Sequence, residues 1–227
     1  YYLFAGLLSI FVQQTFLAVT PTVLIHEKLR IRELFARGNG RSSKVGQSGR
    51  AGQSGGAARS PDPESGGMRF GFGAVVYKLA VYILLNTISM ISCLVIANRL
   101  YAYPIRGDFG YVMVIHAVFL LDLFGIALVL AAFFKDATHC LQFVMFMAVP
   151  SFLSCGFGWP EYMMSAGFAP AIKALWPLYY YSNPLKDLML KGAGWDVTGH
   201  YITGGLIFAA VWIPAGLLIY YFSVDKG

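Results

Sequence analysis

Charged residues are scarce in this chain, and their scarcity excludes an ordinary soluble domain. Only 12% of the 227 residues are charged, whereas 57% are hydrophobic and the mean hydropathy is +0.61. Soluble globular domains carry roughly twice that share of charge. The composition therefore predicts a membrane protein.

Cysteine and histidine are also few, and neither forms a pattern that supports chemistry. The three cysteines, Cys93, Cys140 and Cys155, are widely spaced in or beside apolar segments. This favours buried hydrophobic side chains over a disulfide framework or a metal cluster. The four histidines show no ligand spacing. We therefore predict no metal site in this chain.

Other absences narrow the function. A membrane-embedded enzyme needs convergent ionisable groups, and Asp122, Glu161 and the histidines form no nucleophile–base pattern. We predict no catalytic residue. A secondary carrier is expected to show repeated halves and more intramembrane charge, and neither is visible. A non-transporting scaffold or assembly subunit remains an alternative to a transporter.

Long apolar segments are what the sequence does contain. About 20 apolar residues cross a hydrocarbon core of roughly 30 Å, and five segments qualify. They cover residues 1–25, 72–98, 109–134, 140–157 and 201–224. We expect an all-α polytopic bundle that forms a single transmembrane domain over residues 1–227. Because the chain begins within a span and without Met, we expect a further segment upstream.

Basic residues are concentrated in one connection. Nine of the 17 Lys and Arg lie between Lys28 and Arg69, which places this connection in the cytoplasm by the positive-inside rule. Alternation of the spans then gives eleven basic residues inside and five outside. The net charge of +6 is therefore a topology signal, and we expect no nucleic-acid partner.

The connection itself has two parts. Residues 26–37 predict a short amphipathic helix, stopped by Gly38, in which Ile31, Leu34 and Phe35 share one face. Two readings stay open for it: a flank that lies on the membrane, or a docking element for a soluble partner. Residues 38–67 are rich in Gly, Ser and Arg and predict a flexible cytoplasmic loop. This loop lacks the Gly-Lys-Ser/Thr ending of a phosphate loop, so we predict that the chain does not bind ATP there.

A few polar residues lie within the spans. Gln13 and Gln14 are near the middle of the first, and such amides usually face protein. Lys78 is close enough to the cytoplasmic start of the second span to snorkel. Asp122 lies near the centre of the third span, where a charge is costly. It is expected to form an interhelical hydrogen bond or to take part in translocation.

The fourth span ends in a broken segment. Gly156, Gly158 and Pro160 interrupt the helix, and an extracytoplasmic stretch rich in aromatic residues follows over residues 158–200. Broken backbone at membrane depth is tolerated only where protein or water satisfies its polar groups. We therefore expect a re-entrant hairpin, with short helices permitted at Met163–Met164 and Ala169–Leu175.

Four short segments carry a resemblance to a known family. They are Tyr103–Gly107 (Tyr-Pro-Ile-Arg-Gly), Pro150–Pro160, Trp176–Tyr180 (Trp-Pro-Leu-Tyr-Tyr) and Leu188–Gly194 (Leu-Met-Leu-Lys-Gly-Ala-Gly). In order and spacing they resemble the membrane subunit of type-2 ABC exporters, the permeases of bacterial drug, lipid and polysaccharide efflux systems. The resemblance implies six spans, of which these five are the second to the sixth, with an extracytoplasmic domain after the first.

The resemblance also implies partners and a mechanism. Each of two permease copies, as a homodimer or heterodimer, would seat a separate ABC-type ATPase, which carries the ATP and Mg. No cofactor would be bound by this chain, and membrane lipids and a periplasmic adaptor are further expected contacts. The family's coupling helix contains a Gly-Thr that this chain lacks. The coupling residues expected from the resemblance are Glu27, Arg30, Ile31, Glu33, Leu34 and Phe35.

Alternating access would move a hydrophobic or amphipathic substrate out of the cytoplasm of a bacterium, across its inner membrane. An outer gate is expected in the broken segment and its rings, since Met and aromatic side chains offer an adaptable apolar exit. The residues assigned to the path or gate are Asp122, Phe157, Trp159, Met163, Met164, Tyr179 and Tyr180.

Overall fold

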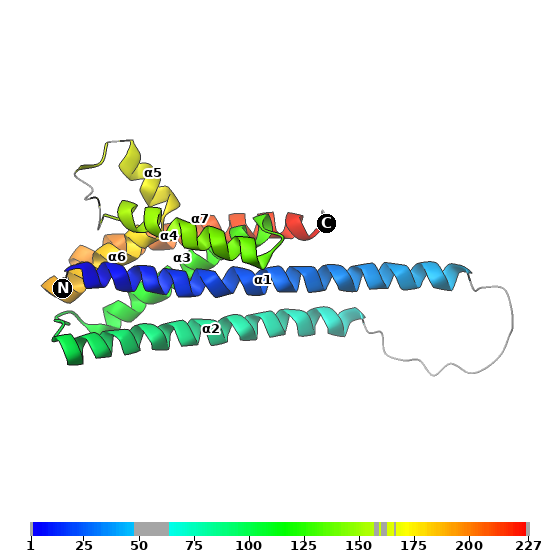
Figure 1. Ribbon diagram of the computed structural model, residues 1–227, viewed down its shortest axis with the longest axis horizontal. Helices are drawn as coiled ribbons and strands as arrows, with labels where there is room; N and C mark the ends of the chain where they lie inside the picture. The colour runs from blue at the N-terminus through cyan, green and yellow to red at the C-terminus, as the bar shows by residue number, and fades with distance from the viewer. Residues whose placement is uncertain (1, 48–63, 157–158, 160–162, 166, 226–227) are drawn as a thin grey trace.

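A computed structural model of the chain describes residues 2–47, 64–156, 159, 163–165 and 167–225. All regular secondary structure in these ranges is helical, and five helices are long and apolar enough to cross a membrane. The predicted all-α bundle with five spans is therefore confirmed. Figure 1 shows two long helices, α1 and α2, lying side by side along the remaining elements.

The helix bounds position everything that follows. The five long helices are α1 (Tyr2–Gln47), α2 (Glu64–Tyr101), α3 (Phe109–Phe133), α4 (Ala137–Ser154) and α7 (Trp195–Asp225). Between α4 and α7 lie the short helices α5 (Phe168–Leu175) and α6 (Leu178–Lys186) and the π-helical turn η2 (Asp187–Lys191).

The first helix is longer than the sequence predicted. We expected a span to residue 25, a separate helix over 26–37 and a loop from Gly38, but α1 continues without a break to Gln47. Pro21 lies inside α1, and a membrane helix tolerates proline where its surroundings satisfy the freed carbonyl. No proline follows until residue 61, and glycine costs a helix only about 1 kcal/mol. The described start of α2 at Glu64 likewise falls within the predicted loop.

Helix α1 lies at the centre of the bundle. It packs against α2, α3, α4 and α6, and α3 packs most extensively against α7. The core is built from side chains of α1, α3 and α6 together with a few from α2 and α4. By contrast, α2 and α4 expose most of their apolar surface, as expected of helices that face lipid or another subunit.

Glycines bring α3 and α7 unusually close together. A Cβ atom at Gly205 of α7 would lie 2.8 Å from Val118 Cγ1, and one at Gly216 would lie 2.9 Å from the carbonyl oxygen of Gly125. Both distances are too short for a real Cβ contact. Small residues at such crossings allow membrane helices to pack backbone against backbone.

The amides in the first span face protein, as predicted. Ser151 Oγ of α4 donates to Gln13 Oε1 at 3.2 Å, and Gln14 Nε2 donates to the Val144 carbonyl at 3.3 Å. On the opposite side of α1, Asn86 Nδ2 of α2 donates to Thr15 Oγ1 at 2.7 Å. These contacts tie the central helix to both lipid-exposed helices.

The chain breaks where the sequence indicated, with shifted boundaries. Helix α4 covers Ala137–Ser154 rather than residues 140–157, and α7 begins at Trp195 rather than residue 201. Asp136 caps α4 by accepting from the Thr138 amide at 3.3 Å, which explains the earlier start. The short helix expected near Ala169–Leu175 is present as α5, and Pro184 is accommodated inside α6.

Candidate functional site

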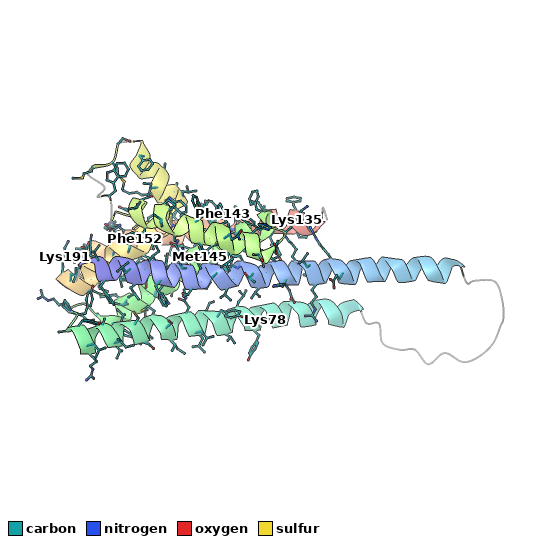
Figure 2. All side chains as sticks on the ribbon, in the orientation of Figure 1. Lys78, Lys135, Phe143, Met145, Phe152 and Lys191 are labelled. Carbon is teal, nitrogen blue, oxygen red and sulfur yellow. The ribbon has the colours of Figure 1, made fainter. Side chains whose placement is uncertain are left out.

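The bundle has two ends of different character. One end, here called the cap end, holds residues 102–108, α5, α6 and η2 beside the start of α1 (Figure 1). The opposite end, here called the Lys28 end, holds Lys28, the end of α3 and the end of α7. Figure 2 shows Lys191 at the cap end and Lys135 toward the Lys28 end.

At the cap end, two of the segments that carried the resemblance bind each other. The Arg106 amide donates to the Met189 carbonyl at 3.2 Å. A Cβ atom at Gly107 would lie 2.6 Å from the carbonyl oxygen of Leu188, so only glycine fits there. Gly192 ends η2 in the left-handed region at φ +66°, beside Arg106. Thus the 103–107 turn and the 188–192 turn form one close backbone contact.

The other two segments also meet. Asn183 Nδ2 of α6 donates to the carbonyl of Cys155 at 2.9 Å and to that of Tyr179 at 3.1 Å. The first bond satisfies a carbonyl just beyond the end of α4. Gly156 turns the chain away with φ +97°, and a Cβ atom there would lie 3.4 Å from Asn183 Oδ1. The four segments, which are spread over about 90 residues of sequence (103–194), are therefore joined in two pairs, the second pair through Asn183 of α6.

A buried polar chain connects α6 to the spans. The Tyr181 hydroxyl lies 3.3 Å from His116 Nδ1, and His116 Nε2 lies 3.3 Å from Thr87 Oγ1. The Tyr181 ring stacks on Phe119 with a centroid distance of 4.2 Å and an interplanar angle of 2°. Tyr181 is fully buried and belongs to the core.

The residues assigned to the gate differ in how far they are exposed. Trp159 and Met163 are exposed, at 45% and 61%, and the Trp159 ring lies 5.5 Å from that of Phe168. Tyr179 is buried against Tyr201, and Tyr180 packs on Gly204 of α7. Met164 is half-buried. Phe157 lies outside the described residues.

Asp122 is fully buried between α3 and α7. A Cβ atom at Gly205 would lie 3.2 Å from its Oδ2, and the Ala209 backbone is nearby. Neither carboxylate oxygen has a hydrogen bond of ordinary geometry within the part of the chain that the structure describes. The structure thus places Asp122 in the close contact between the two helices, beside Gly205, whose added Cβ atom would also lie 3.7 Å from Tyr180 Cβ.

The Lys28 end contains a cluster that the sequence analysis missed. Lys28 Nζ is buried and donates to the carbonyls of Ala131 at 2.6 Å, Ala132 at 3.3 Å and Phe134 at 3.3 Å, and to Ser223 Oγ at 3.2 Å. Four residues on either side along α1, the Leu24 carbonyl accepts from the Tyr220 hydroxyl at 3.0 Å and Arg32 donates to the Ser223 carbonyl.

The signal for this cluster was the spacing of Leu24, Lys28 and Arg32. Residues four apart share one face of a helix, so a single continuous α1 turns all three toward α3 and α7. The predicted short surface helix instead favoured the face with Ile31, Leu34 and Phe35 as the functional one. Sequence alone did not show that α3 would end beside Lys28.

The predicted coupling residues on α1 differ in burial where the structure describes their side chains. Glu27 is buried, with Oε1 3.6 Å from Arg30 Nη1 and Oε2 3.9 Å from Nζ of the half-exposed Lys78 of α2. Arg30 and Glu33 are exposed, and Ile31 lines a shallow apolar groove with residues of α7. The side chains of Leu34 and Phe35 lie outside the described part of the structure.

No group of three or more His, Cys, Asp or Glu side chains that could hold a metal occurs in the described ranges. None of the three cysteines forms a disulfide in the described ranges; Cys140 and Cys155 are buried, and Cys93 is half-buried.

These features define a multi-pass helical membrane protein with a backbone-rich cap at one end and a cationic cluster at the other. Residues 72–218 match the family model described as ABC-2 family transporter protein. Since the match covers more than half of the chain, the protein belongs to the ABC-2 transporter family as its membrane permease. Comparison with curated proteins and with solved structures finds no match.

Membership confirms the resemblance seen in the sequence. The family's membrane subunit has no ATPase activity of its own, and it pairs with ATPase subunits. The match spans α2, α3, α4, the cap and most of α7, and therefore includes all four segments.

Proposed function

We propose that this chain is the membrane subunit of an ATP-driven exporter that moves a hydrophobic or amphipathic substrate out of the bacterial cytoplasm. The observation that carries the proposal is the ABC-2 family match over residues 72–218. Two copies, in a homodimer or heterodimer, would each receive a separate ATPase that carries the ATP and Mg. The inner membrane of a bacterium is the expected location.

The Lys28 end is proposed to face the cytoplasm. Supporting this, α1 has 46 residues, which corresponds to a length of about 69 Å at 1.5 Å per residue. Only Leu3–Glu33 qualifies as a span, so the basic part of α1 extends beyond it. The rule that basic connections stay inside supports the same orientation.

ATPase docking is proposed for the exposed charges Arg30 and Glu33, the groove residue Ile31, and Leu34 and Phe35 one turn further. Glu27 would support this surface from within, because it is buried and pairs with Lys78. A docking element on a long, continuous helix would pass a displacement directly to the part of that helix within the membrane.

The outer gate is proposed for the cap, where Trp159 and Met163 are exposed and Met164, Tyr179 and Tyr180 lie behind them. Phe157 is assigned to the same gate. Such apolar, polarizable side chains suit amphipathic cargo. Asp122 is assigned to the path as a residue that governs how α3 and α7 separate.

The test is purification of the complex from its native host. We expect an ABC-type ATPase to purify with the wild-type chain, and the double variant Leu34→Asp, Phe35→Asp to lose it while still inserting in the membrane. Leu100→Asp, at the exposed cap end of α2, is the matched control and should retain the ATPase. Unchanged co-purification with the double variant would remove the docking assignment. Absence of an ATPase from the wild-type preparation would favour a non-transporting scaffold.

A further inference from the structure

The ammonium group of Lys28 occupies a site that a lysine rarely has in a membrane helix. Its side chain is 1% exposed, and all four of its hydrogen-bond partners belong to other helices or to the residue just after α3. A buried cation is costly unless it is fully hydrogen-bonded. The ammonium group of Lys28 and its hydrogen-bond partners therefore stabilise each other.

The partners explain the site. The last four carbonyls of a helix lack intrahelical donors, and Ala131 and Ala132 provide two of these at the end of α3. The negative end of the helix dipole also favours a cation there. Lys28 thus acts as a C-terminal cap supplied to α3 by a different helix, α1.

Helix α7 joins this contact through Ser223. Its hydroxyl donates to the Ala132 carbonyl at 2.9 Å and accepts from Lys28 at 3.2 Å. Tyr220 and Arg32 add bonds between α1 and α7 one turn to either side. By comparison, the Glu27–Lys78 pair links α1 to α2 more weakly. The Lys78 side chain is half-exposed, and its Nζ lies 3.9 Å from Glu27 Oε2.

We propose that Lys28 is a positioning residue that fixes the middle of α1 to the ends of α3 and α7, so that these three helices move as one unit when the ATPase displaces α1. The inference rests on the proposed function for the source of the displacement. The Glu27–Lys78 pair to α2 contributes little energy by comparison, because an ion pair with a half-exposed lysine is weakened by water.

The test uses the intact complex with its co-purifying ATPase in lipid nanodiscs. Spin labels at Leu29→Cys on α1 and Lys135→Cys after α3, both exposed positions, report the distance between α1 and the end of α3. The three native cysteines are replaced by serine, and ATP hydrolysis by the labelled complex verifies this background. The distance distribution is measured without nucleotide and after trapping with ATP and vanadate.

In the wild type we expect one narrow distribution that nucleotide does not shift. In Lys28→Met we expect the distribution to broaden and its mean to shift on trapping, while the ATPase remains bound. Lys28→Arg should restore the narrow distribution, because a guanidinium also donates to several carbonyls. Lys78→Met makes the same chemical change at the half-exposed lysine and should behave as the wild type.

If Lys28→Met does not fold, the double variant Tyr220→Phe, Ser223→Ala keeps the cation and removes two hydroxyl contacts of α7. Labels at Leu29 and Tyr221 should then separate on trapping, whereas they stay fixed in the wild type. A wild-type distance between residues 29 and 135 that shifts with nucleotide overturns the inference, as does an unchanged distance in Lys28→Met with the ATPase bound. A wild-type complex without an ATPase overturns the proposed function and this inference together.

Discussion

At the cap end, backbone groups bond to backbone groups, whereas at the Lys28 end side-chain cations bond to backbone carbonyls. The cap contact joins Arg106 to Met189 through main-chain atoms, with Gly107 pressed against Leu188. The opposite contact depends on one flexible lysine side chain that reaches three carbonyls and a hydroxyl. The first arrangement fixes a shape, and the second holds separate helices together by a group that a single substitution removes.

The strongest way to break this comparison is to add a side chain at Gly107. Valine there would place atoms within 2.6 Å of the Leu188 carbonyl oxygen, and the neighbouring backbone cannot move aside cheaply. Overpacking costs about 1–3 kcal/mol and sometimes more, so we expect little folded protein by size-exclusion chromatography in detergent. Gly167→Val is the control, since a Cβ atom there meets nothing within 4 Å. A Gly107→Val protein as stable as the control would contradict the close backbone contact.

A second test compares the two lysines by thermal unfolding. Lys28→Met removes the Lys28 donor from the Ala131 carbonyl, whereas the Ala132 carbonyl keeps its bond from the Ser223 hydroxyl, and an unsatisfied buried polar group costs about 1–3 kcal/mol. Lys78→Met removes only a half-exposed ion pair, which contributes at most about 1 kcal/mol. We expect the first variant to melt at a clearly lower temperature than the second. Equal melting temperatures would show that water satisfies the end of α3.

A third test weakens the cap without overfilling it. Asn183→Ala removes the two hydrogen bonds to Cys155 and Tyr179, each contributing about 1 kcal/mol. Because the Cys155 bond holds the turn after α4, we expect faster proteolysis within residues 155–167 as well as a lower melting temperature. Gln142→Ala, at an exposed position of α4, should change neither. Protection equal to the wild type would separate Asn183 from the stability of this turn.

The smallest effect is expected at Asp122. Its carboxylate has no hydrogen bond of ordinary geometry in the described residues, so Asp122→Asn removes a charge and no visible partner. We expect the melting temperature to stay the same or rise slightly, because an ionised group at this depth costs about 2.5–3.5 kcal/mol on insertion scales. If transport also survives, Asp122 is a replaceable packing residue. Loss of transport with intact folding would support its assignment to the path.

Sequence patterns were sufficient for the elements but not for their contacts. Hydropathy located the five spans, since about 20 apolar residues have few alternatives to a membrane helix. Glycine and proline after Ser154 located the cap. The patterns did not show that Gly107 meets Leu188 or that Asn183 reaches Cys155, because these pairs depend on how the helices cross.

The largest miss concerned α1. The sequence predicted a short amphipathic helix over residues 26–37 that stops at Gly38. On the surface of the membrane, Lys28 of such a helix would be solvated. In the structure the helix continues and the α3 carbonyls supply the partners that make a buried lysine affordable. A charge pattern cannot distinguish a solvated lysine from one that caps a neighbouring helix.

The glycine contact between α3 and α7 also limits where cargo could travel. Gly125, Gly205 and Gly216 bring the main chains of α3 and α7 close together. The contact between the two helices therefore contains little side-chain volume that could move aside. A solute could enter the contact between α3 and α7 only if these two helices, which touch along much of their length, moved apart. Any corridor that passes Asp122 therefore requires α3 and α7 to separate, whereas a path along the exposed apolar faces of α2 and α4 does not.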